Sequence, residues 1–235
     1  MERFIFGTFI YEYKLIKQDR KTLSLTVTPE LKLVLKCPKQ VNKERIEKFL
    51  RKKWFWLEKQ LSYFKKYQHK LYQREYISGE SHLYLGRQYK LIVKQGKSSS
   101  VMLNKGQLIL FTDKLVSNSI HNKKLLTSWF EKRVNHIFQE RFIEVLSKFN
   151  YKKEPKLYIR EMSKRWGSFL NQDKIFLNPK LIHAGKECID YVIVHELCHM
   201  KYKKHDNKFY NLLKQKHPRW EKVKSKLEVV GSMIY

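Results

Sequence analysis

The stretch that most constrains this chain is His195-Glu196-x-x-His199, which follows a strongly apolar run at 189–194. Residues four apart lie on the same face of a helix, so both imidazoles can point at one metal ion with Glu196 beside them. A catalytic zinc ion typically has three protein ligands and a water molecule, and a nearby carboxylate can take the proton of that water. The apolar run predicts a buried helix, where these polar side chains need partners that a metal ion would supply. The motif therefore predicts a zinc site with His195 and His199 as ligands and Glu196 as general base.

A third ligand is needed, and His205 is the nearest well-placed candidate. It follows His199 by six residues, which is enough chain to end the helix, turn and bring a side chain back to the metal. The spacing agrees with the pattern His-Glu-x-x-His-x-x-Gly-x-x-His, but Tyr202 replaces the turn glycine, so the turn must differ. A later helix could instead contribute Glu221 or Glu228. We favour His205, because one motif then accounts for all three ligands.

The charge balance favours a polyanionic partner or a solvated basic surface. Fifty Lys and Arg residues against 22 Asp and Glu residues give a formal net charge of +28. Such a charge suits nucleic acid, a nucleotide or an anionic lipid surface. The basic residues are spread along the chain, so a lysine-rich surface without a dedicated partner explains them equally well. Trp54 and Trp56 beside Arg51–Lys53 could form a platform for nucleic acid, but we expect these tryptophans to pack.

Cysteine usage and hydropathy bear on location. Cys37, Cys188 and Cys198 form no Cys-x-x-Cys pair and are odd in number, which fits a reducing cytoplasm. Cys198 lies inside the histidine motif, where we expect a small buried helix residue rather than a ligand. No apolar run approaches about 18 residues, so no membrane span is expected. The apolar segment 4–11 is short, and it predicts a strand rather than a signal peptide.

Hydrophobic periodicity predicts a mixture of strands and helices. Alternating apolar residues indicate strands between 9 and 38, and helical spacing follows from Asn42 to about residue 67. Strands and hairpins are expected between 83 and 111, and an amphipathic helix over about 119–149. Two strands at 156–160 and 174–178 are expected to pair.

This order of elements predicts an α+β fold in two domains. The first, over 1–118, is β-rich with one long helix near 42–67. The second, over 119–235, is a helical metal-binding domain with a small antiparallel sheet. No internal repeat is evident at a convincing period.

The loop between the two paired strands is the second informative place. A strand pair directly before a metal-binding helix can form the edge of a cleft, along which a peptide lies by strand addition. Arg160, Lys164 and Arg165 would place positive charge there, which suits an oxyanion or a phosphate. The alternative is a tight hairpin with Trp166 in the core and solvated basic side chains. The sequence leaves both open.

Several motifs together make the chain similar to a known family. They are Arg-Glu-Met-Ser-Lys-Arg-Trp-Gly-Ser at 160–168, Ile-Phe-Leu-Asn at 175–178, the stretch 189–199 with His205, the helix with Trp54 and Trp56, and Gly79-Glu80 followed by Leu-Gly-Arg-Gln-Tyr at 85–89. On these residues the chain resembles the YgjP-like family of zinc metallopeptidases, bacterial relatives of the SprT and WLM zincins. The resemblance covers nearly the whole chain, and its C-terminal motifs are the specific ones.

The resemblance implies a zincin-like catalytic domain with one zinc ion (Zn2+) per chain. His195, His199 and His205 would be the ligands and Glu196 the catalytic base. Six further residues would shape the site, namely Arg160, Arg165, Trp166, Gly167, Ser168 and Asn178. The family pattern usually continues Trp-Gly-Ser with Cys, and Phe169 stands there in this chain, so any role of that thiol is absent.

These observations predict a cytoplasmic, zinc-dependent hydrolase, in the first place a metallopeptidase that acts on peptide or protein substrates. Tyr158, Arg160 and Arg165 are the candidates to stabilise the oxyanion. Two alternatives keep the metal site. The enzyme could hydrolyse phosphoanhydrides as a nucleotide phosphohydrolase. As the SprT resemblance suggests, it could also act on proteins bound to nucleic acid, with the β-rich N-terminal part as the binding module.

Overall fold

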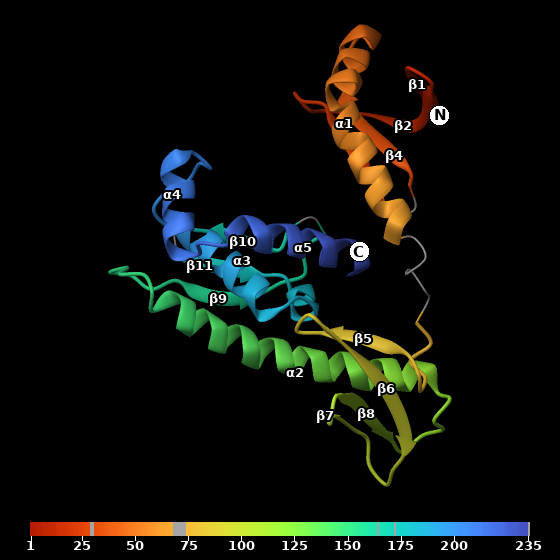
Figure 1. Ribbon diagram of the computed structural model, residues 1–235, viewed down its shortest axis with the longest axis vertical. Coiled ribbons are helices and arrows are strands. Elements are labelled where there is room, and N and C mark those ends of the chain that lie inside the picture. The colour runs from red at the N-terminus through yellow and green to blue at the C-terminus, as the bar shows by residue number, and fades with distance from the viewer. Residues whose placement is uncertain (29–30, 68–73, 164, 172, 235) are drawn as a thin grey trace. The chain divides into compact units, whose positions relative to one another are not determined.

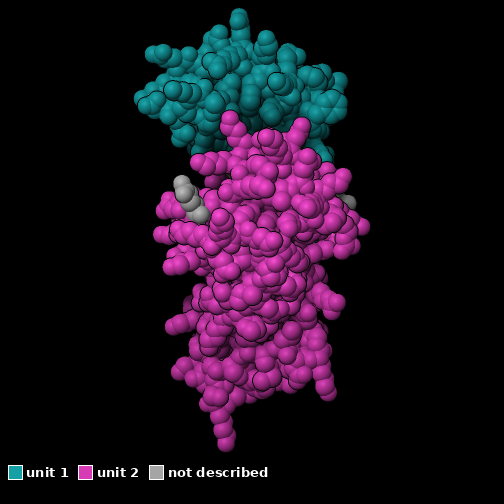
Figure 2. All heavy atoms as spheres, turned by 90° about the vertical axis from the view of Figure 1, so that its left-hand side faces the viewer, with its two compact units in different colours: residues 1–72, 235 teal, residues 73–234 magenta. Residues whose placement is uncertain are grey.

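The computed structural model describes residues 1–28, 31–67, 74–163, 165–171 and 173–234. Strands come early in the chain and most helices come later, which confirms the predicted α+β class (Figure 1). The chain forms two compact units, residues 1–72 and residues 73–234 (Figure 2). This grouping differs from the predicted division after residue 118, because the second sheet shares a core with the helix that follows it.

In the N-terminal unit, a helix packs on a four-stranded sheet. The strands β1 (Glu2–Phe6), β2 (Phe9–Gln18), β3 (Ser24–Val27) and β4 (Leu33–Pro38) lie in the order β1-β2-β4-β3. β2 and β4 are parallel, and the other two pairs are antiparallel. Leu33 and Leu35 alternate with exposed or half-buried neighbours along β4, and they pack on Ile46 and Leu50 of α1 (Lys43–Tyr67).

The start of α1 and its tryptophan are fixed by local hydrogen bonds. Arg45 N–H donates to Asn42 Oδ1 at 3.1 Å, which caps the helix as the sequence predicts. Trp54 Nε1 donates to the Tyr11 hydroxyl at 2.9 Å, and its ring stacks on Phe6 with centroids 4.6 Å apart. Trp54 is therefore a packing residue, as expected, whereas Trp56 is exposed.

The C-terminal unit begins with a second four-stranded sheet. The strands β5 (Ser81–Tyr84), β6 (Arg87–Gln95), β7 (Ser100–Asn104) and β8 (Gln107–Thr112) lie in the order β5-β6-β8-β7. β6 and β8 are parallel, and the other pairs are antiparallel. Leu91, Leu108 and Leu110 pack on Leu126 of α2 (Ser119–Leu146). Asn118 caps α2 by accepting from His121 N–H at 3.0 Å.

These two sheets and their helices have the same topology. We call β1–β4 with α1 the first module and β5–β8 with α2 the second module. Each has a hairpin, a parallel central pair, an outer antiparallel strand and an asparagine-capped helix. Phe6 and Tyr84, which end the first strands, are 78 positions apart, whereas Leu33 and Leu108 are 75 apart. The repeat is one of topology without a fixed sequence period, because the offset varies and few residues are identical.

The remainder of the C-terminal unit carries the histidine motif. A three-stranded sheet has the order β10-β11-β9, formed by β9 (Lys156–Ile159), β10 (Gly167–Leu170) and β11 (Lys174–Leu177). The predicted pairing of β9 with β11 is confirmed. The pair is parallel and β10 adds an antiparallel strand, so the sheet is mixed and the expectation of an antiparallel sheet was wrong. A short helix η2 (Pro179–His183) leads to α3 (Lys186–Cys198), α4 (Asn207–Lys216) and α5 (Trp220–Ile234).

The core of this unit surrounds α3. Phe138 of α2, Leu177 of β11 and Leu227 of α5 all belong to the cluster that encloses it. Arg141 of α2 donates from Nε and Nη2 to the two carboxylate oxygens of Asp190, both at 2.7 Å. This bidentate pair fixes α3 alongside α2, and Figure 1 shows the two helices side by side.

Candidate metal centre

The histidine motif lies at the end of a helix that is buried on nearly every side. α3 begins at Lys186 after Gly185 and ends with His199 as its C-cap. Its apolar residues are buried all around the helix: Cys188, Ile189, Tyr191, Val192, Ile193, Val194, Leu197 and Cys198. Packing against α2, α4, α5 and the small sheet sustains this helix despite its many β-branched residues. His195 and Glu196 therefore project from a rigid element.

A short turn returns the chain to the same place. Tyr202 N–H donates to the Cys198 carbonyl at 2.9 Å and ends the helix. Asp206 then caps α4 by accepting from Phe209 N–H at 3.0 Å, which places His205 directly before that helix. His205 Nε2 lies 3.0 Å from His195 Nε2.

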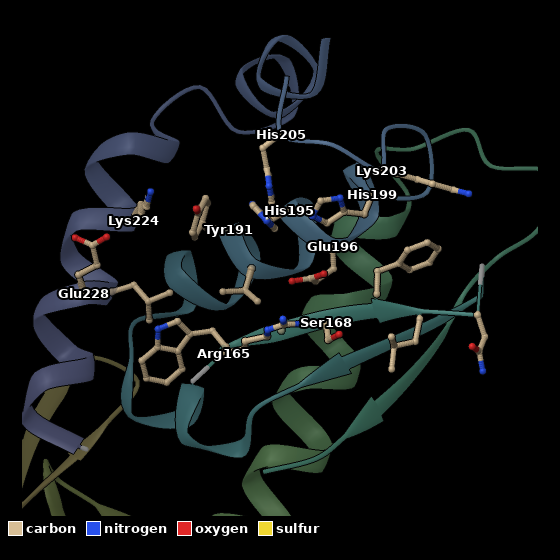
Figure 3. A pocket seen from close by; sticks show the side chains of 17 residues that line it. Arg165, Ser168, Tyr191, His195, Glu196, His199, Lys203, His205, Lys224 and Glu228 are labelled. Atoms are coloured by element: carbon tan, nitrogen blue, oxygen red, sulfur yellow. Dashed lines mark hydrogen bonds between the residues drawn. The ribbon is translucent and has the colours of Figure 1, made fainter. Parts of the chain in front are cut away.

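The three histidines form one cluster (Figure 3). One ligand nitrogen from each of His195, His199 and His205 lies within 4.8 Å of the others. Among the residues that the structure describes, neither Glu221 nor Glu228 belongs to this cluster. Glu228 does line the same pocket, whereas Glu221 does not.

Hydrogen bonding and burial prepare the imidazoles to bind a cation. The Tyr202 carbonyl lies 3.1 Å from His199 Nδ1, so a proton on that nitrogen leaves the Nε2 lone pair available. Burial lowers the pKa of His195 to about 3, with smaller effects from His199, His205 and Lys224. Burial also lowers the pKa of His199. Both rings are therefore neutral at pH 7, which is the form that binds a metal.

Phe209 packs against all three histidines. Its ring centroid lies 5.0 Å from that of His195, 4.8 Å from that of His199 and 4.7 Å from that of His205. The side chain is completely buried. It restricts the imidazoles from the side of α4 and keeps water away from that part of the cluster.

Glu196 is a buried carboxyl beside the cluster. It is 6% exposed, and burial raises its pKa to about 7. The Phe169 N–H hydrogen bond and the charge of Arg165 oppose this rise. Gly167 of β10 lies against the carboxylate, since a Cβ there would be 2.7 Å from Glu196 Oε1. A carboxyl with this pKa can take up and release a proton near neutral pH.

A pocket of about 760 Å³ opens over these groups (Figure 3). It is lined by the three histidines and Glu196, and by four of the six residues expected to shape the site, which are Arg165, Trp166, Gly167 and Ser168. Lys164 lies outside the described residues. Trp166 also packs against α5, where a Cβ on Gly231 would be 3.0 Å from its ring. The pocket wall thus combines the cleft and the packed tryptophan that the sequence left as alternatives.

Arg160 and Tyr158 lie elsewhere. The Arg160 guanidinium is 4.3 Å from the centroid of the Phe176 ring, and Tyr158 stacks on the same ring at 5.2 Å. Phe176 points away from the core face of β11, because its neighbours Ile175 and Leu177 are fully buried. Neither Arg160 nor Tyr158 lines the pocket. The structure therefore places both outside this pocket.

Asn178 supports the pocket from behind. It is completely buried, and its Nδ2 donates to the Met162 carbonyl at 2.7 Å and to the Arg165 carbonyl at 3.0 Å. Its Oδ1 accepts from Lys180 N–H at 3.1 Å. Asn178 does not line the pocket, but it holds the segment that does.

Several pocket residues were not predicted from the sequence, including Tyr191, Lys203 and Lys224. Tyr191 precedes His195 by one helical turn, so the spacing could have indicated it. Lys224 comes from α5, and no local pattern links that helix to the motif. Burial raises the pKa of Tyr191 to about 12, so its hydroxyl stays protonated.

A cluster of three histidines, with a buried glutamate on the helix that carries His195, lies beside the edge of a sheet, and this is the arrangement of a metal-dependent hydrolase. Comparison with known proteins agrees. The model of the YgjP-like metallopeptidase domain matches residues 21–229, and the chain belongs to this family.

Two solved structures are also similar to this chain. The metallopeptidase zymogen jannalysin of Methanocaldococcus jannaschii is 25% identical, with a TM-score of 0.35 over 38% of this chain and 86% of that one. The zymogen abylysin of Pyrococcus abyssi is 20% identical, with a TM-score of 0.33 over 40% and 90%. No curated protein matches. Within the described residues, no helix is long and apolar enough to cross a membrane.

Proposed function

We propose that this protein is a zinc-dependent peptidase, in which His195, His199 and His205 hold one zinc ion and Glu196 is the general base. One observation carries the proposal: three imidazole nitrogens lie within 4.8 Å of one another beside a buried glutamate. The family supports a metallopeptidase, and the choice of zinc follows from the ligands.

The histidines fit zinc. Neutral imidazole is a preferred zinc ligand, and a tetrahedral ion with bonds of 2.0–2.1 Å separates two ligand nitrogens by about 3.3 Å. The observed 3.0 Å between Nε2 of His195 and Nε2 of His205 is close to that value. A bound zinc ion would polarise the scissile carbonyl and lower the pKa of a water molecule to about 7.

Glu196 would move the proton. A buried carboxylate beside the ligands can accept a proton from the attacking water and later give it to the leaving amine. Phe169 N–H holds the carboxylate against β10, and Gly167 leaves the space for it. The base is thus held in one position before the substrate arrives.

The edge of the small sheet would align the substrate. β10 pairs with β11 and, among the described residues, with no other strand, and its residues 167–170 line the pocket. A peptide could add to this edge as a further strand. Arg165 and Tyr191 are then the candidates to stabilise the oxyanion, because both line the pocket and both are donors at neutral pH.

A location in the cytoplasm is part of the proposal. Cys37, Cys188 and Cys198 are all free and buried, which suits a reducing compartment.

The charge of the pocket favours a second candidate function. Arg165, Lys203 and Lys224 line it, so an anionic substrate would be attracted. A nucleotide phosphohydrolase that uses the same metal site is therefore the alternative.

The deciding experiment compares the wild type with Glu196→Gln on a denatured protein and on a panel of nucleoside triphosphates. The variant should keep its zinc and lose at least 100-fold in protein cleavage. Glu228→Gln is the matched control, since it removes another pocket carboxylate and should retain most activity. Cleavage of triphosphates alone, abolished by Glu196→Gln, would overturn the peptidase proposal.

A further inference from the structure

One surface of the first module is apolar where the second module is polar. Four large apolar residues of the first module are exposed: Phe9 (48%), Ile10 (65%), Phe55 (82%) and Trp56 (38%). In the second module, the hairpin register aligns Phe9 and Ile10 with Arg87 and Gln88. Counting from the helix caps aligns Phe55 and Trp56 with Glu131 and Lys132. These four polar residues are also exposed. The fold itself therefore does not require apolar side chains at these positions.

Most of these side chains gather at the tip of the β1–β2 hairpin. Ile5 and Ile10 form a cross-strand pair, 59% and 65% exposed. On the other face, the ring of Phe9 lies 5.9 Å from that of Trp54, which is 5.0 Å from that of Phe55. We call Ile5, Phe9, Ile10 and Phe55 the tip surface. Clustered exposed apolar side chains are typical of interaction sites.

In the second module, the hairpin turn beside these positions holds a polypeptide segment of the same chain. Leu85 N–H donates to the Ile182 carbonyl at 2.8 Å, and Gly86 N–H lies 3.2 Å from the His183 carbonyl. The ring centroids of His183 and Phe130 are 5.0 Å apart. The tip of the β5–β6 hairpin thus holds η2 by main-chain hydrogen bonds and an aromatic contact.

The tip of the first module offers the same kinds of group. By the hairpin register, Gly7 and Thr8 correspond to the two turn residues that hold η2, and by the helix caps Trp54 corresponds to Phe130. Within the described residues, neither turn amide makes a backbone hydrogen bond outside the strands. β1 is also an edge strand, so a further backbone can pair there.

The positive charge of the N-terminal unit indicates which kind of partner it attracts. Residues 1–72 contain 18 Lys and Arg against 7 Asp and Glu, a net charge of +11. Arg51, Lys52 and Lys59 are exposed on α1 about one turn from Phe55. Acidic residues would therefore be attracted beside the apolar contact. Nucleic acid binds by stacking its bases on aromatic rings, whereas this site has two isoleucines and the edge of a sheet. These groups suit a polypeptide better.

We propose that the tip surface, together with the adjoining Gly7-Thr8 turn that matches the turn holding η2, binds an apolar polypeptide segment flanked by acidic residues. Its role in recruiting substrates rests on the proposed peptidase function. The binding itself does not.

The test uses the full-length chain with Glu196→Gln, so that the probe is not cleaved. The probe is a fluorescent synthetic peptide with a Leu-Ile-Phe core between Asp and Glu residues. Two comparison peptides replace the acidic flanks by Lys or the apolar core by Ser. Only the first should bind well, with at least tenfold weaker binding for the others.

Surface variants locate the site. Ile10→Ser combined with Phe55→Ser should weaken binding at least tenfold. Ile120→Ser removes a similarly exposed side chain, 84% against 82% for Phe55, from the C-terminal unit and should change nothing. Equal peptide binding by the parent and the double variant would overturn the proposal. It would also be overturned if a dT oligonucleotide bound the chain and lost its binding on substitution of Phe55, while the peptide kept its own. A wild-type chain that cleaves no protein would refute the peptidase function and leave this binding test intact.

Discussion

Gly167 lies directly against the Glu196 carboxylate. A Cβ at position 167 would be 2.7 Å from Glu196 Oε1 and 2.9 Å from its Cγ, distances that real Cβ atoms essentially never show. The Trp-Gly-Ser motif is therefore tied to the histidine helix by steric necessity. The glycine allows the edge strand to approach the base.

Gly167→Ala should displace Glu196 while leaving the histidines in place. We expect about 100-fold lower turnover at unchanged metal content, because misplacing a catalytic group by about 1 Å can cost that much. Gly185→Ala is the matched control, since its Cβ would meet only Glu187 Cγ at 3.8 Å. Steady-state kinetics and metal analysis check both variants, and full turnover by Gly167→Ala would contradict the packing argument.

Phe209→Leu should weaken metal binding. The ring contacts all three imidazoles, so its loss lets them move and admits water. We expect roughly tenfold lower metal affinity in competition with a chelating dye. Phe138→Leu is the control, because it is equally buried in the same core but contacts none of the histidines. Equal metal affinities in the two variants would refute a specific role for Phe209.

Asn178→Asp should destabilise the fold although the side chains have the same shape. The amide donates to the carbonyls of Met162 and Arg165, and a carboxylate would face both oxygens without a proton. We expect a loss of about 3 kcal/mol in the free energy of unfolding. Asn135→Asp, on the exposed face of α2, should cost little. Thermal unfolding measures the difference, and equal midpoints would contradict it.

His82 predicts acid sensitivity. It is completely buried, its Nδ1 lies 3.0 Å from the Arg74 guanidinium, and burial lowers its pKa from 6.5 to about 4. The unfolded chain therefore takes up a proton between about pH 6.5 and pH 4 that the folded chain does not. The free energy of unfolding falls across this window as pH decreases, by about 3 kcal/mol in total from this residue.

Urea unfolding at several pH values tests this contribution. His82→Gln should show a shallower dependence on pH between 6.5 and 4 than the wild type. Some dependence should remain, because burial also lowers the pKa of His183. An unchanged slope in the variant would show that His82 does not cause it.

The sequence was most informative where local rules decide. Helical spacing alone joins His195, Glu196 and His199, and the apolar run before them correctly predicted a buried helix. Asn42 and its helix were predicted from capping and periodicity. His205 could be named because six residues after His199 suffice for a turn back to the metal, and because one motif then accounts for all three ligands.

Local rules did not predict the positions of side chains that depend on strand pairing or on the packing of helices distant in the sequence. Arg160 directly follows β9. Alternation along the neighbouring strand β11 turns the Phe176 ring away from the pocket, and the Arg160 guanidinium packs on that ring. Lys224 reaches the pocket only because α5 packs on α3. The two modules share burial and register with little sequence identity, so their repeat emerges only from the strand order.

Metal analysis of the purified chain tests the central claim most directly. The wild type and His136→Ala, which removes an exposed histidine on α2, should each carry about one zinc ion per chain. His199→Ala and His205→Ala should lose most of theirs, because each removes one of three ligands. Full zinc content in His199→Ala would contradict the account.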